Sequence, residues 1–303
     1  MRPASLRAKI LGHLFLVYIS WGSSYIGFKL TLEVLGPFLA CGCRMALAGG
    51  MLALVLAVLG RWNRATLTDW RHAAVFGIFM VLMASGFLSK GQMYIDSSVA
   101  AVLVGSTPIS MLVGGWIFAG EPRPSGMQWL GLLGGLAGLL LLGVSQNSPG
   151  GAQASPVGIF WVLGATLAWV AGSLCMRKRP FVTKLSAMQS CALLLFAGGM
   201  ETILLGLLCG EAAMTRFENL RPEVALAFAW MVVGGSILAY SSYFWLLEHA
   251  SIATAVSYEY VVPVIGVFLG WRLGGENVNP KMLLACCMTV GSVFFLLWQR
   301  HSR

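Results

Sequence analysis

Charged residues are scarce in this chain. Only 10% of its 303 residues are charged, 11 are acidic, and 58% are hydrophobic. The mean hydropathy is +0.80. Soluble globular domains carry about 25% charged residues, so this composition excludes a soluble fold. The chain is therefore predicted to be an integral membrane protein.

Signatures of the common enzyme classes are also missing. The sequence has no GxSxG, no HExxH, no Walker loop and no pair of aspartates inside a hydrophobic run. Its seven cysteines form no CxxC pair and have no histidine at ligand spacing, so they are interpreted as small apolar packing residues. An intramembrane protease or acyltransferase would need a nucleophile beside a base, and no such pair can be assembled. We predict no enzymatic activity, no metal site and no cofactor.

Long hydrophobic runs dominate what is present. Ten runs have the length of about 20 residues that a helix needs to cross a bilayer. They are 10–29, 38–59, 73–93, 98–119, 126–145, 157–176, 185–209, 224–247, 252–271 and 281–299. The loops between them leave no room for a soluble domain. We predict an all-α integral membrane protein with ten transmembrane helices.

The basic residues are distributed unevenly over the predicted loops. With a cytoplasmic N-terminus, thirteen lysines and arginines fall on the inside, six fall on the outside, and Arg44 alone lies within a span. This is the positive-inside bias of membrane proteins. We expect a multi-pass protein of the bacterial inner membrane with both termini in the cytoplasm. The net charge of +9 is then a topology signal, and no nucleic acid partner is expected.

Two parts of the chain share motifs at one spacing. SerThrPro at 106–108 precedes GlyGlu at 120–121, and ValValPro at 261–263 precedes GlyGlu at 275–276, an offset of 155 residues for both motifs. We predict a five-helix repeat at 1–145, a periplasmic linker at 146–156 and a second repeat at 157–303. Because each repeat has an odd number of spans, the two repeats are inverted, as in many transporters.

The motifs resemble a known family. WGSSY (21–25), AAVLVGSTP (100–108) and the glycine-rich GLLGGLAGLLLL (131–142) look like the EamA-type repeat of the drug/metabolite transporter superfamily, and ATAVSYEYVVP (253–263) resembles it again. The likeness covers nearly the whole chain. It implies ten spans in two inverted five-helix repeats, a central cavity, and transport of small organic molecules, often export. The second copy departs from the pattern where Glu259 stands in place of Val104.

Pro108 and Pro263 occupy equivalent places in two predicted spans. A proline within a helix leaves the carbonyl four residues earlier without its donor, here the carbonyls of Val104 and Glu259. Such a carbonyl must face protein or a water-filled cavity. Two interpretations remain open: a kink that only shapes packing, or a broken helix that lines the substrate site.

The candidate substrate-binding residues are aromatic, hydroxyl and proline residues on the predicted central spans, with one carboxylate. They are Trp21, Ser24, Tyr25, Thr107, Pro108, Trp169, Ser173, Tyr243, Tyr258, Glu259 and Pro263. Aromatic walls suit an amphipathic or cationic organic solute, and neutral or aromatic amino acids equally well. Glu259 is expected either to exchange a proton or bind an amine, or to be a structural carboxylate bonded to a hydroxyl or to Arg44. Arg44 and Glu201 are a further hypothetical ion pair.

The sequence thus predicts a transporter, in the export direction, for a small organic metabolite, amino acid or drug that moves by alternating access. Its expected partners are a small-molecule substrate, the lipid bilayer, and protons if Glu259 couples transport to them. One alternative is an exchanger of two metabolites. Another, of a different class, is a non-transporting polytopic sensor or lipid-processing protein.

Overall fold

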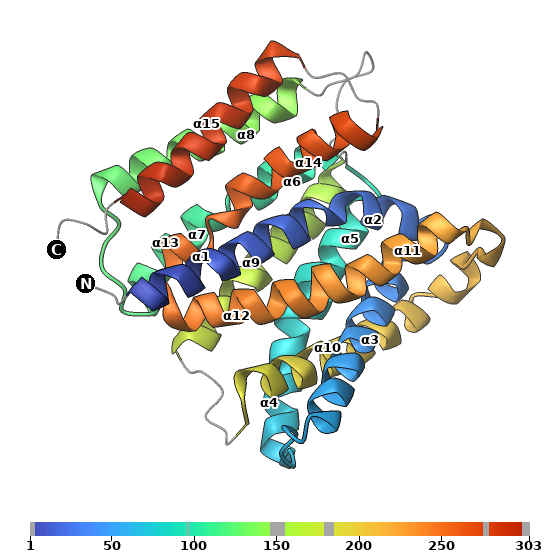
Figure 1. The fold of residues 1–303 in the computed structure, drawn as a ribbon. Coiled ribbons are helices and arrows are strands. Elements are labelled where there is room, and N and C mark those ends of the chain that lie inside the picture. Colours follow the sequence, from blue (N-terminus) through green and yellow to red (C-terminus); the bar gives the residue numbers. More distant parts are fainter. Residues whose placement is uncertain (1–3, 96, 146–154, 179–184, 275–278, 299–303) are drawn as a thin grey trace.

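The computed structural model describes residues 4–95, 97–145, 155–178, 185–274 and 279–298, and the regular elements of these residues are all helices (Figure 1). The first half contains α1 (Ala4–Gly22), α2 (Ser24–Thr31), α3 (Pro37–Val58), α4 (Leu67–Gly77), the π-helical segment η1 (Ile78–Gly86), α5 (Phe87–Gly91), α6 (Ser97–Val104), α7 (Thr107–Phe118) and α8 (Gly126–Ser145). The second half contains α9 (Pro156–Lys178), α10 (Ala187–Leu208), the short 3-10 turns η2 (Glu211–Met214) and η3 (Phe217–Asn219), α11 (Pro222–Trp230), the π-helical η4 (Met231–Leu238), α12 (Ala239–His249), α13 (Ile252–Ala255), α14 (Tyr258–Gly274) and α15 (Pro280–Trp298). Most of the predicted linker at 146–156 and the second GlyGlu motif at 275–276 lie outside the described residues.

Helix occupies each of the ten predicted ranges. Among the described residues, seven helices are long and apolar enough to cross a membrane, and two shorter apolar helices cover 102–118 and 280–296. The prediction of an all-helical protein with several apolar helices is confirmed. That all ten ranges cross a bilayer stays a prediction.

Side-chain caps fix where several helices begin. Thr66 and Asp69 form a capping box at the start of α4, in which each side chain accepts a backbone N–H of the other residue. The N-terminus of α3 is capped from elsewhere in the chain: Glu211, 1% exposed, accepts the N–H of Leu39 at 2.9 Å. Free N–H groups at a helix start are thereby satisfied by oxygen acceptors.

Helices at equivalent positions of the two halves pack in pairs. α3 packs along α10, and α8 packs along α15, a pair that lies at one edge of the bundle in Figure 1. Two further sets of contacts recur when the halves are exchanged, because α1 contacts α12 and α14 just as α9 contacts η1 and α7. α1 and α9 thus each pack against helices of the other half.

Glycines allow the two paired contacts to be close. A Cβ atom on Gly42 of α3 would stand 2.6 Å from the backbone nitrogen of Ile203 in α10. On α8, a Cβ on Gly138 would stand 3.0 Å from the backbone nitrogen of Thr289 in α15. Helices in lipid associate through such small residues. Gly42 and Gly138 therefore let the two helix pairs pack closely.

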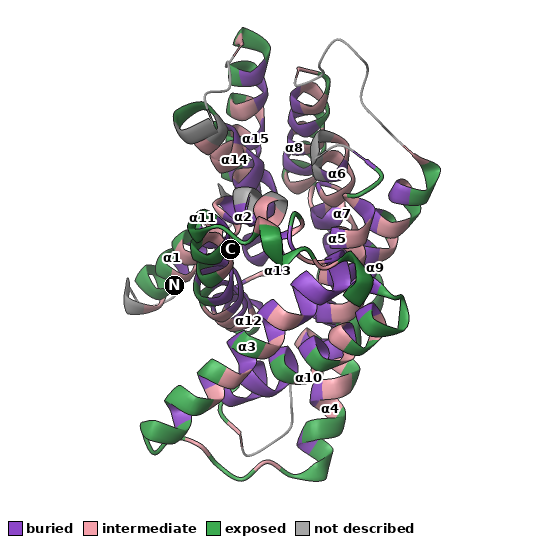
Figure 2. Cartoon of the chain, turned by 90° about the vertical axis from the view of Figure 1, so that its right-hand side faces the viewer, coloured by how far each residue is buried: buried purple, intermediate pink, exposed green. Residues whose placement is uncertain are grey.

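The outer surface of the bundle is apolar. Figure 2 shows buried residues on the inward faces of the helices and exposed ones on the outward faces. Large hydrophobic side chains are among the most exposed, including Val58 at 79% and Leu208 at 77%. An exposed apolar surface of this kind is expected where lipid replaces water.

Candidate functional site

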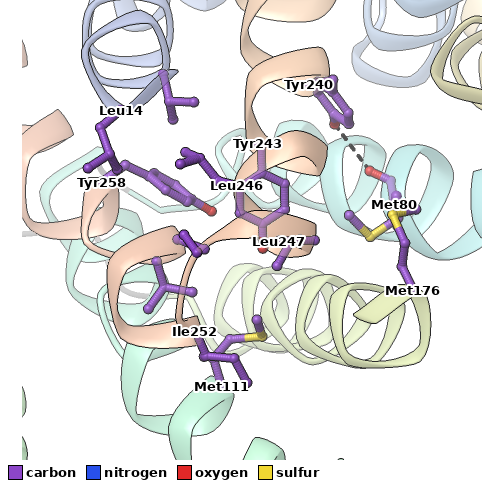
Figure 3. Close-up of a cluster of buried hydrophobic side chains, with 14 of the residues drawn as sticks. Leu14, Met80, Met111, Met176, Tyr240, Tyr243, Leu246, Leu247, Ile252 and Tyr258 are labelled. Carbon is purple, nitrogen blue, oxygen red and sulfur yellow. Dashed lines mark hydrogen bonds between the residues drawn. The ribbon is translucent and has the colours of Figure 1, made fainter. Parts of the chain in front are cut away.

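Five aromatic rings from four helices meet at the centre of the bundle. The Trp21 ring of α1 lies 4.5 Å from that of Tyr258 and 5.6 Å from those of Trp169 and Tyr243, measured between centroids. Tyr240 of α12 lies 5.8 Å from both tryptophans. Figure 3 shows the three tyrosines among the buried side chains around them. Four of the predicted site residues, Trp21, Trp169, Tyr243 and Tyr258, are thus brought together.

A cavity of about 140 Å³, here called the central cavity, borders this cluster. Six predicted residues line it: Trp21, Ser24, Thr107, Trp169, Tyr258 and Glu259. Its wall also contains residues that were not predicted, notably Phe28, Arg44, Ser85, Gln92 and Tyr240. Pro108, Ser173, Tyr243 and Pro263 do not line it, and the side chain of Tyr25 lies outside the described part of the chain.

The two predicted helix breaks differ from one another. In the first half, the chain leaves α6 at Val104 and starts α7 at Thr107, with Pro108 in its first turn. The hydroxyl of Thr107 donates to the Val104 carbonyl at 2.6 Å. The carbonyl expected to need a partner is therefore satisfied by a side chain next to the break.

In the second half the break comes earlier. It separates α13 from α14 at residues 256 and 257. The position equivalent to the first break, 155 residues later, is 260 and 261. Pro263 lies inside α14. Ser257 donates to the Thr254 carbonyl at 2.8 Å across this break. The second break therefore lies about one helical turn before the position equivalent to the first, and the broken-helix interpretation does not hold at Pro263 itself.

Two π-helical segments supply polar groups to the site instead. They are η1 and η4, and each lies in the middle of a long helix of its half. Tyr240 donates its hydroxyl to the Met80 carbonyl of η1 at 3.2 Å, and the Trp21 indole donates to the Gly235 carbonyl of η4 at 3.0 Å. Met80 and Gly235 are 155 residues apart. A π-helix disturbs the regular backbone hydrogen bonding of the helix. In each half, an aromatic side chain of the cavity wall donates to the carbonyl at the equivalent position of the π-helical segment.

Tyr243 and Ser173 separate the central cavity from a second one. Their hydroxyls are 2.9 Å apart, and both residues are fully buried. The second cavity, about 520 Å³, is lined one turn farther along the same helices, by Met176 on α9 and Leu247 on α12. These two predicted site residues therefore lie between two cavities.

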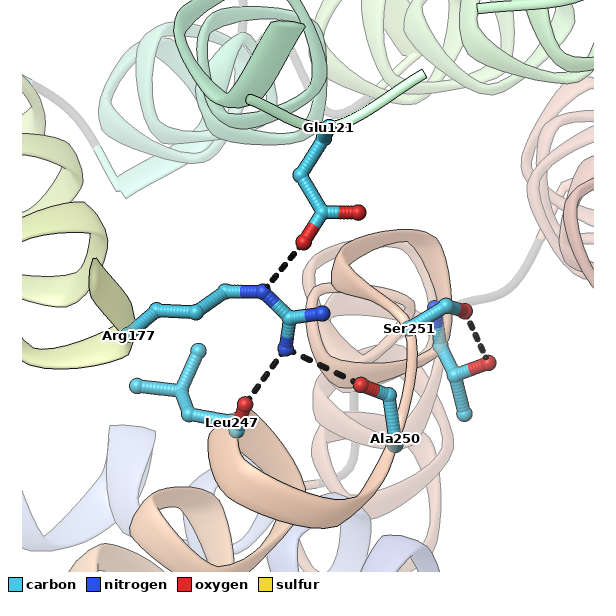
Figure 4. Close-up of polar contacts among 6 residues, drawn as sticks. Glu121, Arg177, Leu247, Ala250 and Ser251 are labelled. Carbon is cyan, nitrogen blue, oxygen red and sulfur yellow. Dashed lines mark hydrogen bonds and ion pairs between the residues drawn. The ribbon is translucent and has the colours of Figure 1, made fainter. Parts of the chain in front are cut away.

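Glu121 and Arg177, which both line the second cavity, form an ion pair (Figure 4). Gly120 takes a left-handed conformation with φ of 71° at the end of α7, which brings Glu121 toward α9. Arg177 donates from Nε to Glu121 Oε1 at 2.6 Å, and from Nη1 to the carbonyls of Leu247 and Ala250 at the end of α12. Gly120 and Glu121 were singled out in the sequence as part of a repeated motif, but Arg177 was not predicted as the partner of Glu121.

Two carboxylates, Glu259 and Glu201, are candidate partners of Arg44 on sequence grounds. Glu259 is 8% exposed and lines the central cavity, and it makes no ion pair with Arg44. Arg44 and Glu201 do not pair either, so that hypothesis was wrong. α3 contacts α10 through the face that carries Gly42, and Arg44, two residues on, points away from that face toward the cavity.

Comparison with known proteins agrees with this architecture. The model of the EamA-like transporter family matches the chain twice, over residues 9–144 and 156–298. The "uncharacterized inner membrane transporter YedA" of Escherichia coli (strain K12) is 30% identical over 285 residues, which cover 94% of this chain and 89% of that protein.

More distant similarities extend over the same length. The "uncharacterized transporter YvbV" of Bacillus subtilis (strain 168) is 24% identical over 92% of this chain and 88% of its own. The "WAT1-related protein At3g02690, chloroplastic" of Arabidopsis thaliana is 23% identical over 92% of this chain and 67% of its own. A solved crystal structure with 16% identity aligns over 98% of this chain and all of that one with a TM-score of 0.76, which shows a shared fold.

Proposed function

The chain belongs to the EamA-like transporter family, and on that premise we propose that it exports a small organic solute across a bacterial inner membrane by alternating access. The central cavity is the substrate site in this proposal. Two inverted five-helix repeats, with both termini in the cytoplasm, move around it. The double match of the family model and the contacts that recur between the halves support this arrangement.

The observation that carries the proposal is the pair of cavities separated by one layer of side chains. On α9, Thr166 and Trp169 line the central cavity, Ser173 lies in the layer, and Met176 lines the second cavity. A transporter with alternating access needs such a barrier, because its site opens to one side at a time. In the predicted topology the second cavity is on the cytoplasmic side, and this structure is closed between it and the substrate site.

Cysteine accessibility tests the proposal. Thr166→Cys reports on the central cavity and Ser190→Cys on the second cavity, each in a background without native cysteines. We expect an impermeant maleimide to reach Thr166→Cys from the periplasm and Ser190→Cys from the cytoplasm. A transported solute should change the two labelling rates in opposite directions. Labelling of Thr166→Cys from both sides at equal rates would indicate a continuous pore and refute alternating access.

Transport is then measured in proteoliposomes. A screen of metabolites by thermal shift of the purified protein selects solutes for uptake and counterflow assays. Solute movement that requires the protein supports a transporter. Failure of every stabilising solute to move would favour a sensor or lipid-processing role.

A further inference from the structure

Arg44 is a buried cation in the wall of the central cavity. It lies in the second turn of α3 and is 3% exposed. Its guanidinium carbon lies over the Phe28 ring, 5.0 Å from the ring centroid. Its Nε is buried and has no hydrogen-bond partner.

The charge of Arg44 is not balanced by an acidic side chain of the described residues. No carboxylate among them makes an ion pair with it, including Glu259 in the same cavity. Its polar neighbours are neutral, namely the thiol of Cys41 and the hydroxyl of Ser24, which itself donates to the Ser20 carbonyl. Arginine does not lose its proton in proteins, so Arg44 cannot avoid the cost of a buried charge by becoming neutral. An ionisable residue at such depth marks a ligand or ion path unless a partner explains it.

We propose that Arg44 binds the carboxylate of a small organic substrate, an inference that rests on the proposed transport function. A guanidinium has donors along its edge that match the two oxygens of a carboxylate. The Nε–H of Arg44 is a buried donor of this kind that lacks a partner among the described residues. A Cβ atom on Gly235 would stand 3.4 Å from Arg44 Nη1 and 2.8 Å from Ser24 Oγ, so the glycine keeps the space beside both groups open.

The rest of the cavity defines the rest of the substrate. Its walls beyond Arg44 and Glu259 are largely apolar and aromatic, with Trp21, Trp169 and Val262 among them. The volume of about 140 Å³ resembles that of protein cavities of about 150 Å³ that bind benzene. The substrate class is therefore a monocarboxylate with a small apolar or aromatic body. A dianion such as phosphate would place a second charge against apolar walls, which is unfavourable.

Matched probes test the carboxylate. Benzoate, benzyl alcohol and benzylamine share one ring and differ in charge, and their affinities for the full-length protein in detergent can be measured by tryptophan fluorescence and thermal shift. We expect benzoate to bind the wild-type protein at least about tenfold more tightly than the other two, because charge-assisted hydrogen bonds are the stronger ones. Arg44→Gln should abolish this preference and leave the affinity for benzyl alcohol unchanged. Arg44→Lys keeps the charge but loses the paired N–H donors of the guanidinium, so it should retain part of the preference for benzoate.

Control measurements make the result decisive. Arg221→Gln removes an exposed arginine far along the chain and should leave benzoate binding unchanged. Equal binding of the three probes, no benzoate binding, unchanged preference in Arg44→Gln, or chloride competing as well as benzoate would each overturn the carboxylate site. If Arg44→Gln does not fold, the smaller preference expected of Arg44→Lys decides the question. Since binding is measured without transport, a protein that binds benzoate through Arg44 but moves no solute would refute the proposed function alone.

Discussion

Replacing Glu121 by glutamine tests whether the ion pair with Arg177 holds the cytoplasmic side closed. The two side chains are 28% and 19% exposed, so the pair is partly shielded from water. Hydrogen bonds to charged groups contribute about 1.5 to 3 kcal/mol, and Glu121→Gln keeps an acceptor for Arg177 while it removes the charge. We therefore expect the closed state to lose about 1 to 2 kcal/mol relative to the open one. Since 1.4 kcal/mol corresponds to a factor of ten, the open population should rise about 5- to 30-fold.

The labelling rate of Thr166→Cys from the cytoplasmic side measures this change. Glu33→Gln is the matched control, because Glu33 also pairs with an arginine at 2.6 Å, but its side chain and that of Arg221 are 40% and 57% exposed. Exposed pairs contribute about 0 to 1 kcal/mol, so the control should change the rate little. If Glu121→Gln labels at the wild-type rate while circular dichroism shows normal folding, Glu121 and Arg177 do not control closure.

Three further predictions concern the scaffold and the site. Burial raises the pKa of the Glu211 carboxyl above its ordinary value of 4.5. The protonated carboxyl therefore contributes fully to stability below pH 4.5, and this contribution is lost as the pH rises through the higher pKa of the folded state. Glu211→Gln should flatten this part of the stability profile in thermal melts. Gly42→Ala should lower the yield of folded protein in size-exclusion chromatography, whereas Gly291→Ala, where a Cβ atom would meet nothing within 4 Å, should not. In proteoliposomes Trp21→Ala should reduce transport far more than Phe295→Ala, whose ring is 38% exposed, and equal tolerance would make Trp21 a packing residue.

Features that depend on composition and periodicity could be predicted from the sequence. The ten apolar runs coincide with helices, because any chain segment in lipid must satisfy its own backbone hydrogen bonds. Trp21 and Trp169, both among the candidate residues named from the sequence, also lie together, with ring centroids 5.6 Å apart. Such features follow from the local sequence or from the repeat alone.

Contacts that depend on how side chains turn within the bundle were not predictable in the same way. Arg44 and Glu201 lie in two helices that pack together, yet the glycine face of α3 sets its rotation and turns Arg44 toward the cavity. The position of the second helix break depends on Ser257, whose hydroxyl satisfies a freed carbonyl, rather than on Pro263. Proline removes a donor, but a nearby hydroxyl decides where the chain can leave the helix.

The π-helical segments explain why the cavity wall needs aromatic donors rather than aromatic rings alone. η1 and η4 sit where the two long helices pass the cavity, and the carbonyls of Met80 and Gly235 accept their hydrogen bonds from Tyr240 and Trp21. A phenylalanine at either donor position would keep an aromatic ring, a smaller one at Trp21, and would leave a buried carbonyl without that partner, which costs about 1 to 3 kcal/mol. Tyr240 and Trp21 contact each other, so each donor also positions the ring on which the other packs. The walls of the central cavity and the irregular helices behind them are therefore one hydrogen-bonded unit, and a change in either should reach the other.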